Sequence, residues 1–162
     1  MTKHLIAALA AALSAPALAA DSLVVQVKRL SLDTAVKIAQ GAIAACRAKG
    51  IQIAATVVDR EGIVQVTLRD TIAAPITVSI SEMKAKTAVN FNAATSALTA
   101  RADTPIGRIN GLVMSAGGVP VLVGGSALVA AVGVSGAPAG ETDEECALAG
   151  VAKVQEDLDM AM

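Results

Sequence analysis

Three charged side chains stand out because each adjoins an apolar stretch: Asp59 at a turn between two β-branched runs, Arg69 at the end of the second run, and Lys84 within a helical pattern. Two cations beside backbone N–H groups can hold an anion such as a carboxylate or a propionate. The glycine pair Gly117 and Gly118 offers such N–H groups. Solvated charges on a turn and on a helix face are the plainer alternative for the same residues.

The sequence offers little for nucleophilic or acid–base catalysis. His4 is the only histidine, and it lies in a segment that we expect to be removed, so the mature chain would have no imidazole. Ser135 is not in a GxSxG elbow, because Ala137 stands where the second glycine is needed. The thioethers of Met83 and Met114 could bind a soft metal ion or simply fill gaps in the core. These residues favour a binding protein over an enzyme, and no catalytic residue is assigned.

The first twenty residues have the features of a secretory signal peptide. Lys3 is followed by the apolar run from Leu5 to Leu13 and then by Ala17, Leu18 and Ala19. The run is much shorter than the roughly 20 residues of a membrane-spanning helix, which is the alternative. We therefore expect cleavage near Ala19 or Ala20, no stable membrane anchor, and a periplasmic or secreted domain over residues 21–162.

Composition excludes some partners. Thirteen Lys and Arg residues against fourteen Asp and Glu residues give a net charge of −1, and the chain has one Phe, no Tyr and no Trp. A nucleic-acid-binding surface needs a cationic patch and often aromatic stacking groups. The hydrophobic fraction of 54% predicts instead a folded domain, and self-association would cover part of its apolar surface.

Periodicity predicts the elements up to residue 110. Apolar residues three and four apart indicate a helix over residues 31–49, with Ser31 as N-cap and Gly50 as its end. Residues 51–58 and 63–68 read as a β-hairpin around the turn at 59–62. A second helix is expected over residues 76–91, and a short one between residue 95 and Asp103.

The segment from Gly111 to Gly140 holds eight of the thirteen glycines among short apolar runs. We predict two or three strands here, with turns at Gly117–Gly118 and Gly124–Gly125. Neither GxGxxG nor GxxxxGK[ST] occurs in it, so a nucleotide site is not expected.

The chain ends with a predicted helix. Thr142 and Glu145 have the spacing of a capping box, and one face of the helix is apolar, consisting of Ala147, Val151, Val154 and Leu158. The order helix, hairpin, helix, strands, helix predicts one α/β (α+β) domain with an antiparallel sheet and helices on its faces.

Cys46 and Cys146 are the only cysteines. Both lie on the apolar faces of predicted helices, so they are either a disulfide in an exported protein or two buried thiols.

Six motifs, in order along the chain, resemble the GlcG/HbpS family of haem-binding proteins, also similar to the C-terminal domain of PduO-type corrinoid adenosyltransferases. They are Val57-Val58-Asp59 with Gly62, Arg69-Asp70, Lys84-Ala85-Lys86-Thr87-Ala88, Gly117-Gly118-Val119-Pro120, Val132-Gly133-Val134-Ser135-Gly136 and Asp143-Glu144-Glu145-Cys146-Ala147-Leu148-Ala149-Gly150. The resemblance covers nearly all of the expected mature chain.

The resemblance implies a profilin-like fold with α/β/α layers around a five-stranded antiparallel sheet, and homo-oligomers that are often octamers. It also implies that haem or a related tetrapyrrole is the ligand. Arg69 and Lys84 would then hold its propionates beside Gly117 and Gly118. We expect Met114, rather than Met83, to be the ligand of the haem iron. Two alternatives stay open: an enzyme or enzyme accessory that acts on a small carboxylate such as glycolate through Asp59, Arg69 and Lys84, and a purely structural oligomer.

Overall fold

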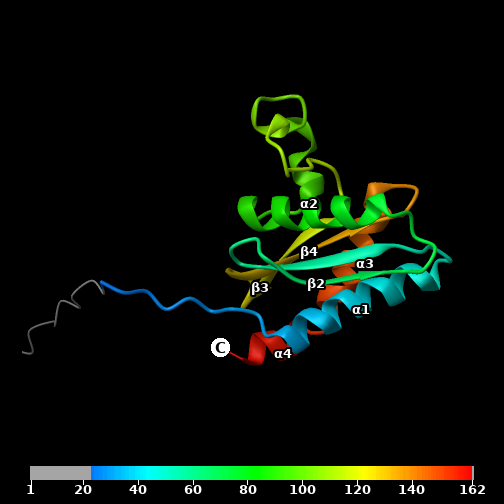
Figure 1. The fold of residues 1–162 in the computed structure, drawn as a ribbon. Coiled ribbons are helices and arrows are strands. Elements are labelled where there is room, and N and C mark those ends of the chain that lie inside the picture. Colours follow the sequence, from blue (N-terminus) through cyan, green and yellow to red (C-terminus); the bar gives the residue numbers. More distant parts are fainter. Residues whose placement is uncertain (1–22, 162) are drawn as a thin grey trace, which may run out of the picture.

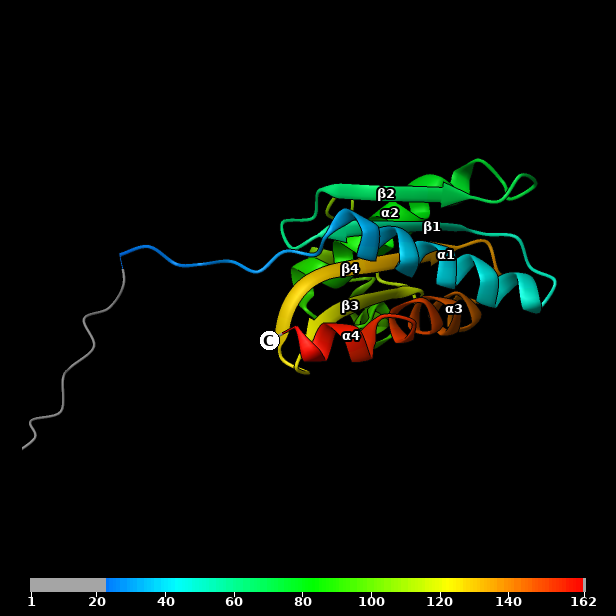
Figure 2. The same ribbon diagram turned by 90° about the horizontal axis from the view of Figure 1, so that it is seen from below.

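The computed structural model describes residues 23–161. The predicted signal peptide and its cleavage site therefore lie outside the described residues. Within them, a four-stranded antiparallel sheet carries helices α1 and α3 on one face and helix α2 on the other (Figures 1 and 2). The predicted mixed helix and antiparallel-sheet architecture is confirmed.

Helix α1 spans Leu32–Ala48. The Ser31 hydroxyl accepts a hydrogen bond from the backbone N–H of Thr34 at 3.3 Å, which makes Ser31 the predicted N-cap. Lys49 is the C-cap, and Gly50 follows with a φ of +73°, a left-handed conformation that glycine adopts without strain. The predicted ends of this helix are confirmed.

Strands β1 (Ala54–Asp59) and β2 (Val64–Arg69) form the predicted hairpin. The carboxylate of Asp59 stabilises its turn by accepting hydrogen bonds from the N–H groups of Glu61 and Ile63, at 3.0 and 2.9 Å. The Asp59 carboxylate thus has a structural role in the turn.

Helix α2 covers Ile76–Phe91, the range that its periodicity predicts, and ends at Asn92 in a left-handed conformation. The chain then forms two short 3-10 helices, η1 (Thr95–Arg101) and η2 (Ile106–Arg108), which project beyond α2 in Figure 1.

The glycine-rich segment forms two strands, β3 (Gly118–Val123) and β4 (Ala127–Ser135). The turn predicted at Gly124–Gly125 joins them. The turn predicted at Gly117–Gly118 is wrong, because Gly118 already pairs with Gly133 as the first residue of β3.

The sheet has the order β2-β1-β4-β3, so the expected five strands are four in the described residues. Between α2 and β3 the chain carries Pro105, Gly107 and Gly111 and lacks an alternating apolar run, so it turns instead of pairing.

Helices α3 (Gly140–Ala152) and α4 (Gln155–Met160) end the described chain. The predicted capping box is wrong: α3 begins at Gly140, so Thr142 lies inside its first turn, and Ala139 makes no side-chain cap. Glu145 instead forms an ion pair with Lys49 of the α1 C-cap. The predicted apolar face is confirmed, since Ala147, Val151 and Val154 are buried and Leu158 is half-buried.

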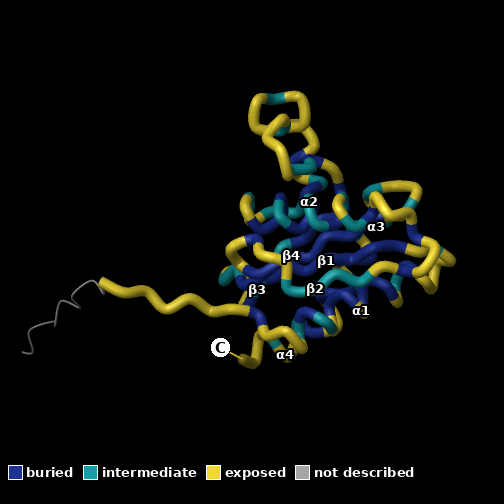
Figure 3. Tube along the Cα trace, viewed as in Figure 1, coloured by how far each residue is buried: buried dark blue, intermediate teal, exposed yellow. Residues whose placement is uncertain are grey.

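The core lies mainly between the sheet and the α1/α3 layer (Figure 3). Cys46 of α1 and Cys146 of α3 are fully buried there and form a disulfide, which decides between the two predicted states of these cysteines. The α2 face is packed with small residues, and Gly133 allows the closest approach: a Cβ there would lie 2.0 Å from the Ser81 carbonyl oxygen. Ser81 and Thr56 also share a hydrogen bond of 2.8 Å across this interface.

Candidate functional site

Lys84 points from α2 into the protein and not into solvent. Its Nζ donates to the Asp143 carboxylate at 2.8 Å and to the Val134 carbonyl at 3.0 Å, and both side chains of the ion pair are about 95% buried. Asp143 in turn accepts the N–H of Ala137 at 2.9 Å. This buried ion pair joins α2 to β4 and to the first turn of α3.

Burial raises the pKa of Asp143 above its ordinary value of 3.8, while the hydrogen bonds from Lys84 and Ala137 and the Lys84 charge act in the opposite direction. Since the Lys84 ammonium already has an anionic partner and little solvent contact, a ligand carboxylate would have to displace Asp143 to reach it.

Gly117 and Gly118 do lie beside Lys84, as the predicted site requires. A Cβ on Gly117 would be 2.6 Å from Lys84 Nζ, and one on Gly118 would be 2.4 Å from the Lys84 carbonyl oxygen. Their N–H groups already donate, at 3.0 Å to the Glu144 carboxylate and at 2.8 Å to the Thr95 hydroxyl. In this structure the two glycines allow α2 to approach β3, and their amides bind side chains of the protein.

Asp59 and Arg69 lie at opposite ends of the β1–β2 hairpin. Asp59 adjoins the turn, whereas Arg69 pairs with Ala54 at the far end. The Asp59 carboxylate receives Arg29 at 3.5 Å. The Arg69 guanidinium donates to the carbonyls of Thr71 and Ala73, and no acidic group among the described residues pairs with it.

Met114 is buried, with 6% of its surface exposed, in the segment between η2 and β3. Its neighbour Val113 donates its N–H to the hydroxyl of Thr87 in α2 at 2.9 Å, which holds the segment against the helix. In residues 23–161, no three His, Cys, Asp or Glu side chains converge as metal ligands, and no helix has the length and apolarity to cross a membrane.

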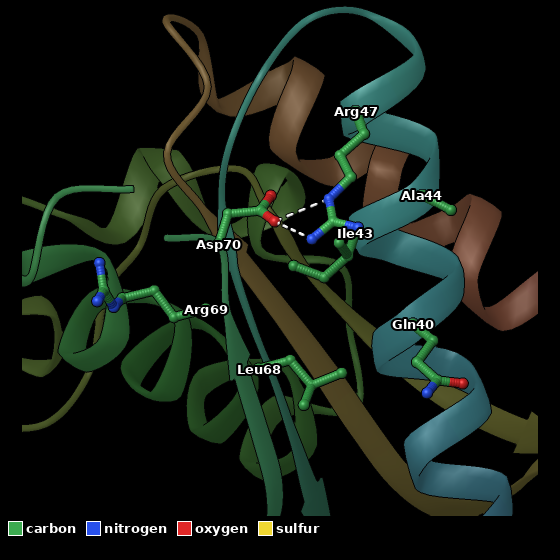
Figure 4. Close-up of a pocket in the computed structure, with 7 residues that line it drawn as sticks. All are labelled: Gln40, Ile43, Ala44, Arg47, Leu68, Arg69 and Asp70. Atoms are coloured by element: carbon green, nitrogen blue, oxygen red, sulfur yellow. Dashed lines mark hydrogen bonds and ion pairs between the residues drawn. The ribbon is translucent and has the colours of Figure 1, made fainter. Parts of the chain in front are cut away.

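One concave surface lies between α1 and the edge strand β2 (Figure 4) and has a volume of about 330 Å³. We call it the α1–β2 groove; it is lined by Gln40, Ile43, Ala44, Arg47, Leu68, Arg69 and Asp70. At one end Arg47 donates to the buried Asp70 carboxylate at 2.8 Å. The Arg69 side chain points away from the groove in Figure 4, so Arg69 contributes backbone more than charge to it.

A second concave surface of about 380 Å³ lies where α1 begins, beside the β3–β4 hairpin and α4. We call it the N-terminal pocket; it is lined by Lys28, Arg29, Leu30, Ser31, Thr34, Val123, Val129, Leu158 and Ala161. Its wall is apolar and its rim is cationic. Arg29 pairs with Glu61 at 3.1 Å as well as with Asp59, whereas Lys28 has no acidic partner among the described residues.

Sequence reasoning missed the N-terminal pocket because three segments distant in the chain form it. The signal present in the sequence was the adjacent cations Lys28 and Arg29, placed directly before an apolar residue and the Ser31 N-cap.

Comparison with known proteins identifies the family. The model of the family described as haem degrading protein HbpS-like matches residues 30–152. A double mutant of Streptomyces reticuli HbpS is 39% identical, with a TM-score of 0.77, over 87% of this chain and 97% of that chain. Another crystal structure of HbpS is 41% identical, with the same TM-score, over 85% of this chain and 99% of that one.

More distant structures share the fold. A crystal structure of a PduOC complex with haem is 23% identical, with a TM-score of 0.70, over 77% of this chain and 94% of that chain. The ORFY protein of Klebsiella pneumoniae is also 23% identical, with a TM-score of 0.77, over 89% of this chain and 99% of that chain. No curated protein sequence matches. The family match over residues 30–152 and the identity to HbpS confirm the resemblance seen in the motifs: the chain belongs to the HbpS-like family.

Proposed function

We propose that this protein binds haem or a related tetrapyrrole, and that the N-terminal pocket is where it binds. The observation that carries the proposal is the family itself, which is described as haem degrading, together with the haem complex of PduOC among proteins of this fold. Of haem binding and haem degradation, binding is the activity that the geometry of this chain supports best.

The pocket suits the two chemical parts of such a ligand. A haem has a large apolar macrocycle and two propionates, so it needs an apolar wall and cations nearby. Leu30, Val123 and Val129 supply the wall, and Lys28 supplies a cation that no described acidic group neutralises. The lining has no imidazole, thiol or thioether, so the pocket would hold the ligand through its apolar surface and its propionates.

The two cations predicted from the sequence are less suitable partners for the haem propionates. Lys84 is neutralised by Asp143 inside the protein. Arg69 has no acidic partner among the described residues, and it stays a predicted propionate partner at the opposite end of the hairpin. Met114 stays the predicted iron ligand, although it lines neither the groove nor the pocket.

We also propose that the protein is exported and that it self-associates. The Cys46–Cys146 disulfide supports export, since disulfides persist mainly in oxidising compartments. The exposed apolar residues Leu23, Val25 and Ile72 support self-association.

Titration of haemin into the purified chain, followed by its Soret band, tests the function and the site. Lys28→Glu reverses the free charge at the pocket, so we expect haemin affinity to fall by roughly tenfold, and by less at high salt. Lys37→Glu makes the same change on an exposed turn of α1 outside the pocket and should leave the affinity unchanged.

The outcomes separate the parts of the proposal. A wild-type chain that leaves the haemin spectrum unchanged rejects haem binding. Equal losses in Lys28→Glu and Lys37→Glu reject the pocket, as does a loss confined to Arg69→Ala, which would place the ligand at the other end of the hairpin. If the Soret band persists when ascorbate is present, the protein binds haemin without degrading it. If the band decays, the protein also degrades haem.

A further inference from the structure

The chain makes a tight turn at Asn110 and Gly111, in the segment between η2 and β3. The N–H of Leu112 donates to the carbonyl of Ile109 at 3.2 Å, and Gly111 has a φ of +89°. This combination is typical of a type II turn, whose third residue needs a positive φ and is commonly glycine. Asn110 and Gly111 are both exposed. The turn therefore presents an Asn-Gly peptide bond to water.

The side-chain amide of an asparagine lies close enough to the next peptide nitrogen for the two groups to react. When that nitrogen loses its proton to hydroxide, it can form a bond to the asparagine Cγ. The bond from Cγ to Nδ2 then breaks, ammonia leaves, and a cyclic succinimide remains. The reaction needs a peptide N–H that no acceptor holds and space around the residue that supplies it.

Gly111 meets both requirements. Its N–H makes no hydrogen bond within residues 23–161, and neither does the side-chain amide of Asn110. A Cβ added to Gly111 would meet no heavy atom within 4 Å beyond its chain neighbours, and the glycine itself has no side chain to crowd its nitrogen. Both reacting groups are thus exposed and unbonded in the turn.

The chain has two other asparagines, Asn90 and Asn92, and neither meets these requirements. Asn90 precedes Phe91 in the last turn of α2, where each N–H bonds to a carbonyl one turn earlier. The N–H of Ala93, which follows Asn92, donates to the carbonyl of Ala88 at 3.2 Å. Because the nitrogen that would have to attack is already bonded, the fold protects both of these side chains.

We propose that Asn110 is a site of self-modification, at which the Gly111 nitrogen displaces ammonia and water then opens the succinimide. Attack of water on the side-chain carbonyl gives aspartate, and attack on the main-chain carbonyl gives isoaspartate, in which the peptide chain runs through the β-carbon. In either case water replaces ammonia, an amide becomes a carboxylate, and the turn gains a negative charge. This modification goes beyond haem binding, because neither residue lines the N-terminal pocket.

The isoaspartate product changes the structure of the turn. Its main chain is longer between Ile109 and Leu112, so the hydrogen bond of 3.2 Å that closes the turn is lost. The change should stop at the next residue, because the N–H of Val113 is held by the hydroxyl of Thr87 in α2 at 2.9 Å. The modified protein should therefore keep its core and differ in this one loop.

Incubation of the purified full chain in weakly alkaline buffer tests the proposal, because base removes the proton from the peptide nitrogen. Peptide mapping by mass spectrometry should find the mass change from amide to acid at Asn110, while Asn90 and Asn92 keep their amides. The aspartate and isoaspartate peptides have equal masses and separate by chromatography, with Asn110→Asp as the reference for aspartate. We expect both products, and ammonia released in proportion to them.

Two matched glycine variants locate the cause. Gly111→Ala places a methyl group beside the attacking nitrogen, so the loss of the Asn110 amide should slow by roughly tenfold or more. Gly125→Ala makes the same change at another exposed glycine with a positive φ, in the β3–β4 turn, and should leave the rate unchanged. Asn110→Gln would need a larger ring and should keep its amide throughout.

Hydrogen exchange tests the structural consequence. In the isoaspartate form, the N–H of Leu112 should exchange faster, while the N–H of Val113 stays protected by Thr87. Asn110→Asp adds the same charge with a normal main chain and should leave both rates as in wild type.

Four outcomes would overturn the proposal. An Asn110 amide that persists in the folded chain but is lost in urea would show that the turn protects it. Equal losses at Asn90 or Asn92 in the folded chain would show that the fold does not select the site. An unchanged rate in Gly111→Ala would remove the role of the glycine. Unchanged exchange at Leu112 in the isoaspartate form would contradict the opening of the turn.

Discussion

The ammonium group of Lys84 lies 2.8 Å from the carboxylate of Asp143, although the residues are 59 positions apart in sequence and their side chains are only 5% and 4% exposed. The pair connects α2, on one face of the sheet, to the first turn of α3. Because both charges are buried, removal of either side chain would leave the other charge buried without a partner, which destabilises the folded state.

Lys84→Met is expected to lower the free energy of unfolding by about 3–5 kcal/mol, since it leaves the Asp143 carboxylate buried without its cation. Lys86→Met is the matched control, because Lys86 pairs with Glu82 at the surface of the same helix, where such pairs contribute less than about 1 kcal/mol. Urea unfolding measures both. Equal losses in the two variants would contradict a special role for the buried pair.

Stability should depend on pH through Asp143. Burial raises its pKa above 3.8 in the folded state, so the folded chain binds this proton more tightly than the unfolded chain. The resulting contribution to stability is full below pH 3.8 and is lost as the pH rises through the raised pKa. Wild type should therefore lose stability relative to Asp143→Asn over this interval. Urea unfolding of both proteins from about pH 3 to pH 7 measures the difference, and a wild type that gains on the variant there would refute the assignment.

Loss of the disulfide should destabilise the domain without affecting haemin. The bond links Cys46 and Cys146 across 100 residues, and closing a loop of this length restricts the unfolded chain by about 4–5 kcal/mol in the chain-entropy description. Cys46→Ala with Cys146→Ala should reduce the free energy of unfolding by a similar amount. Neither residue lines the N-terminal pocket, so haemin affinity should stay constant. Unchanged unfolding with weakened haemin binding would reverse this interpretation.

Elements defined by local signals were predictable from sequence. The range of α2, the Ser31 N-cap and the β1–β2 turn depend on residues a few positions apart, and all three are confirmed. The capping box failed because α3 begins at Gly140, two residues before Thr142, and the start of a helix is not fixed by one short pattern; Glu145, then inside the helix, pairs with Lys49 of the α1 C-cap.

The chemistry of the site was less predictable, because the partners of its residues come from distant segments. Lys84 and the glycine pair do come together, yet their groups are bonded to Asp143, Glu144 and Thr95, which spacing does not reveal. The sequence does place two adjacent acidic residues, Asp143 and Glu144, at the start of a predicted helix. Such carboxylates can bind a buried cation and backbone N–H groups, as they do here with Lys84 and Gly117.

Gly133→Ala tests how closely α2 must approach the sheet. A Cβ at this position would lie 2.0 Å from the Ser81 carbonyl oxygen and 2.5 Å from the Ala85 nitrogen, and both of these are backbone atoms that move only with the helix. Because α2 must then shift and strain the hydrogen bond between Thr56 and Ser81, we expect a loss of roughly 3 kcal/mol in the free energy of unfolding.

Gly125→Ala is the control for this substitution. Gly125 has a φ of +72°, and a Cβ added there would have no heavy atom of another residue within 4 Å beyond its chain neighbours. The added methyl group therefore makes no clash, and we expect the free energy of unfolding to fall only by the backbone strain, about 1–2 kcal/mol. Urea unfolding compares the two variants, and hydrogen exchange at the α2 amides reports whether the helix has loosened. Faster exchange in α2 should accompany Gly133→Ala alone; equal exchange in both variants would mean that the sheet and helix can separate at little cost, and that the glycine is not what sets their spacing.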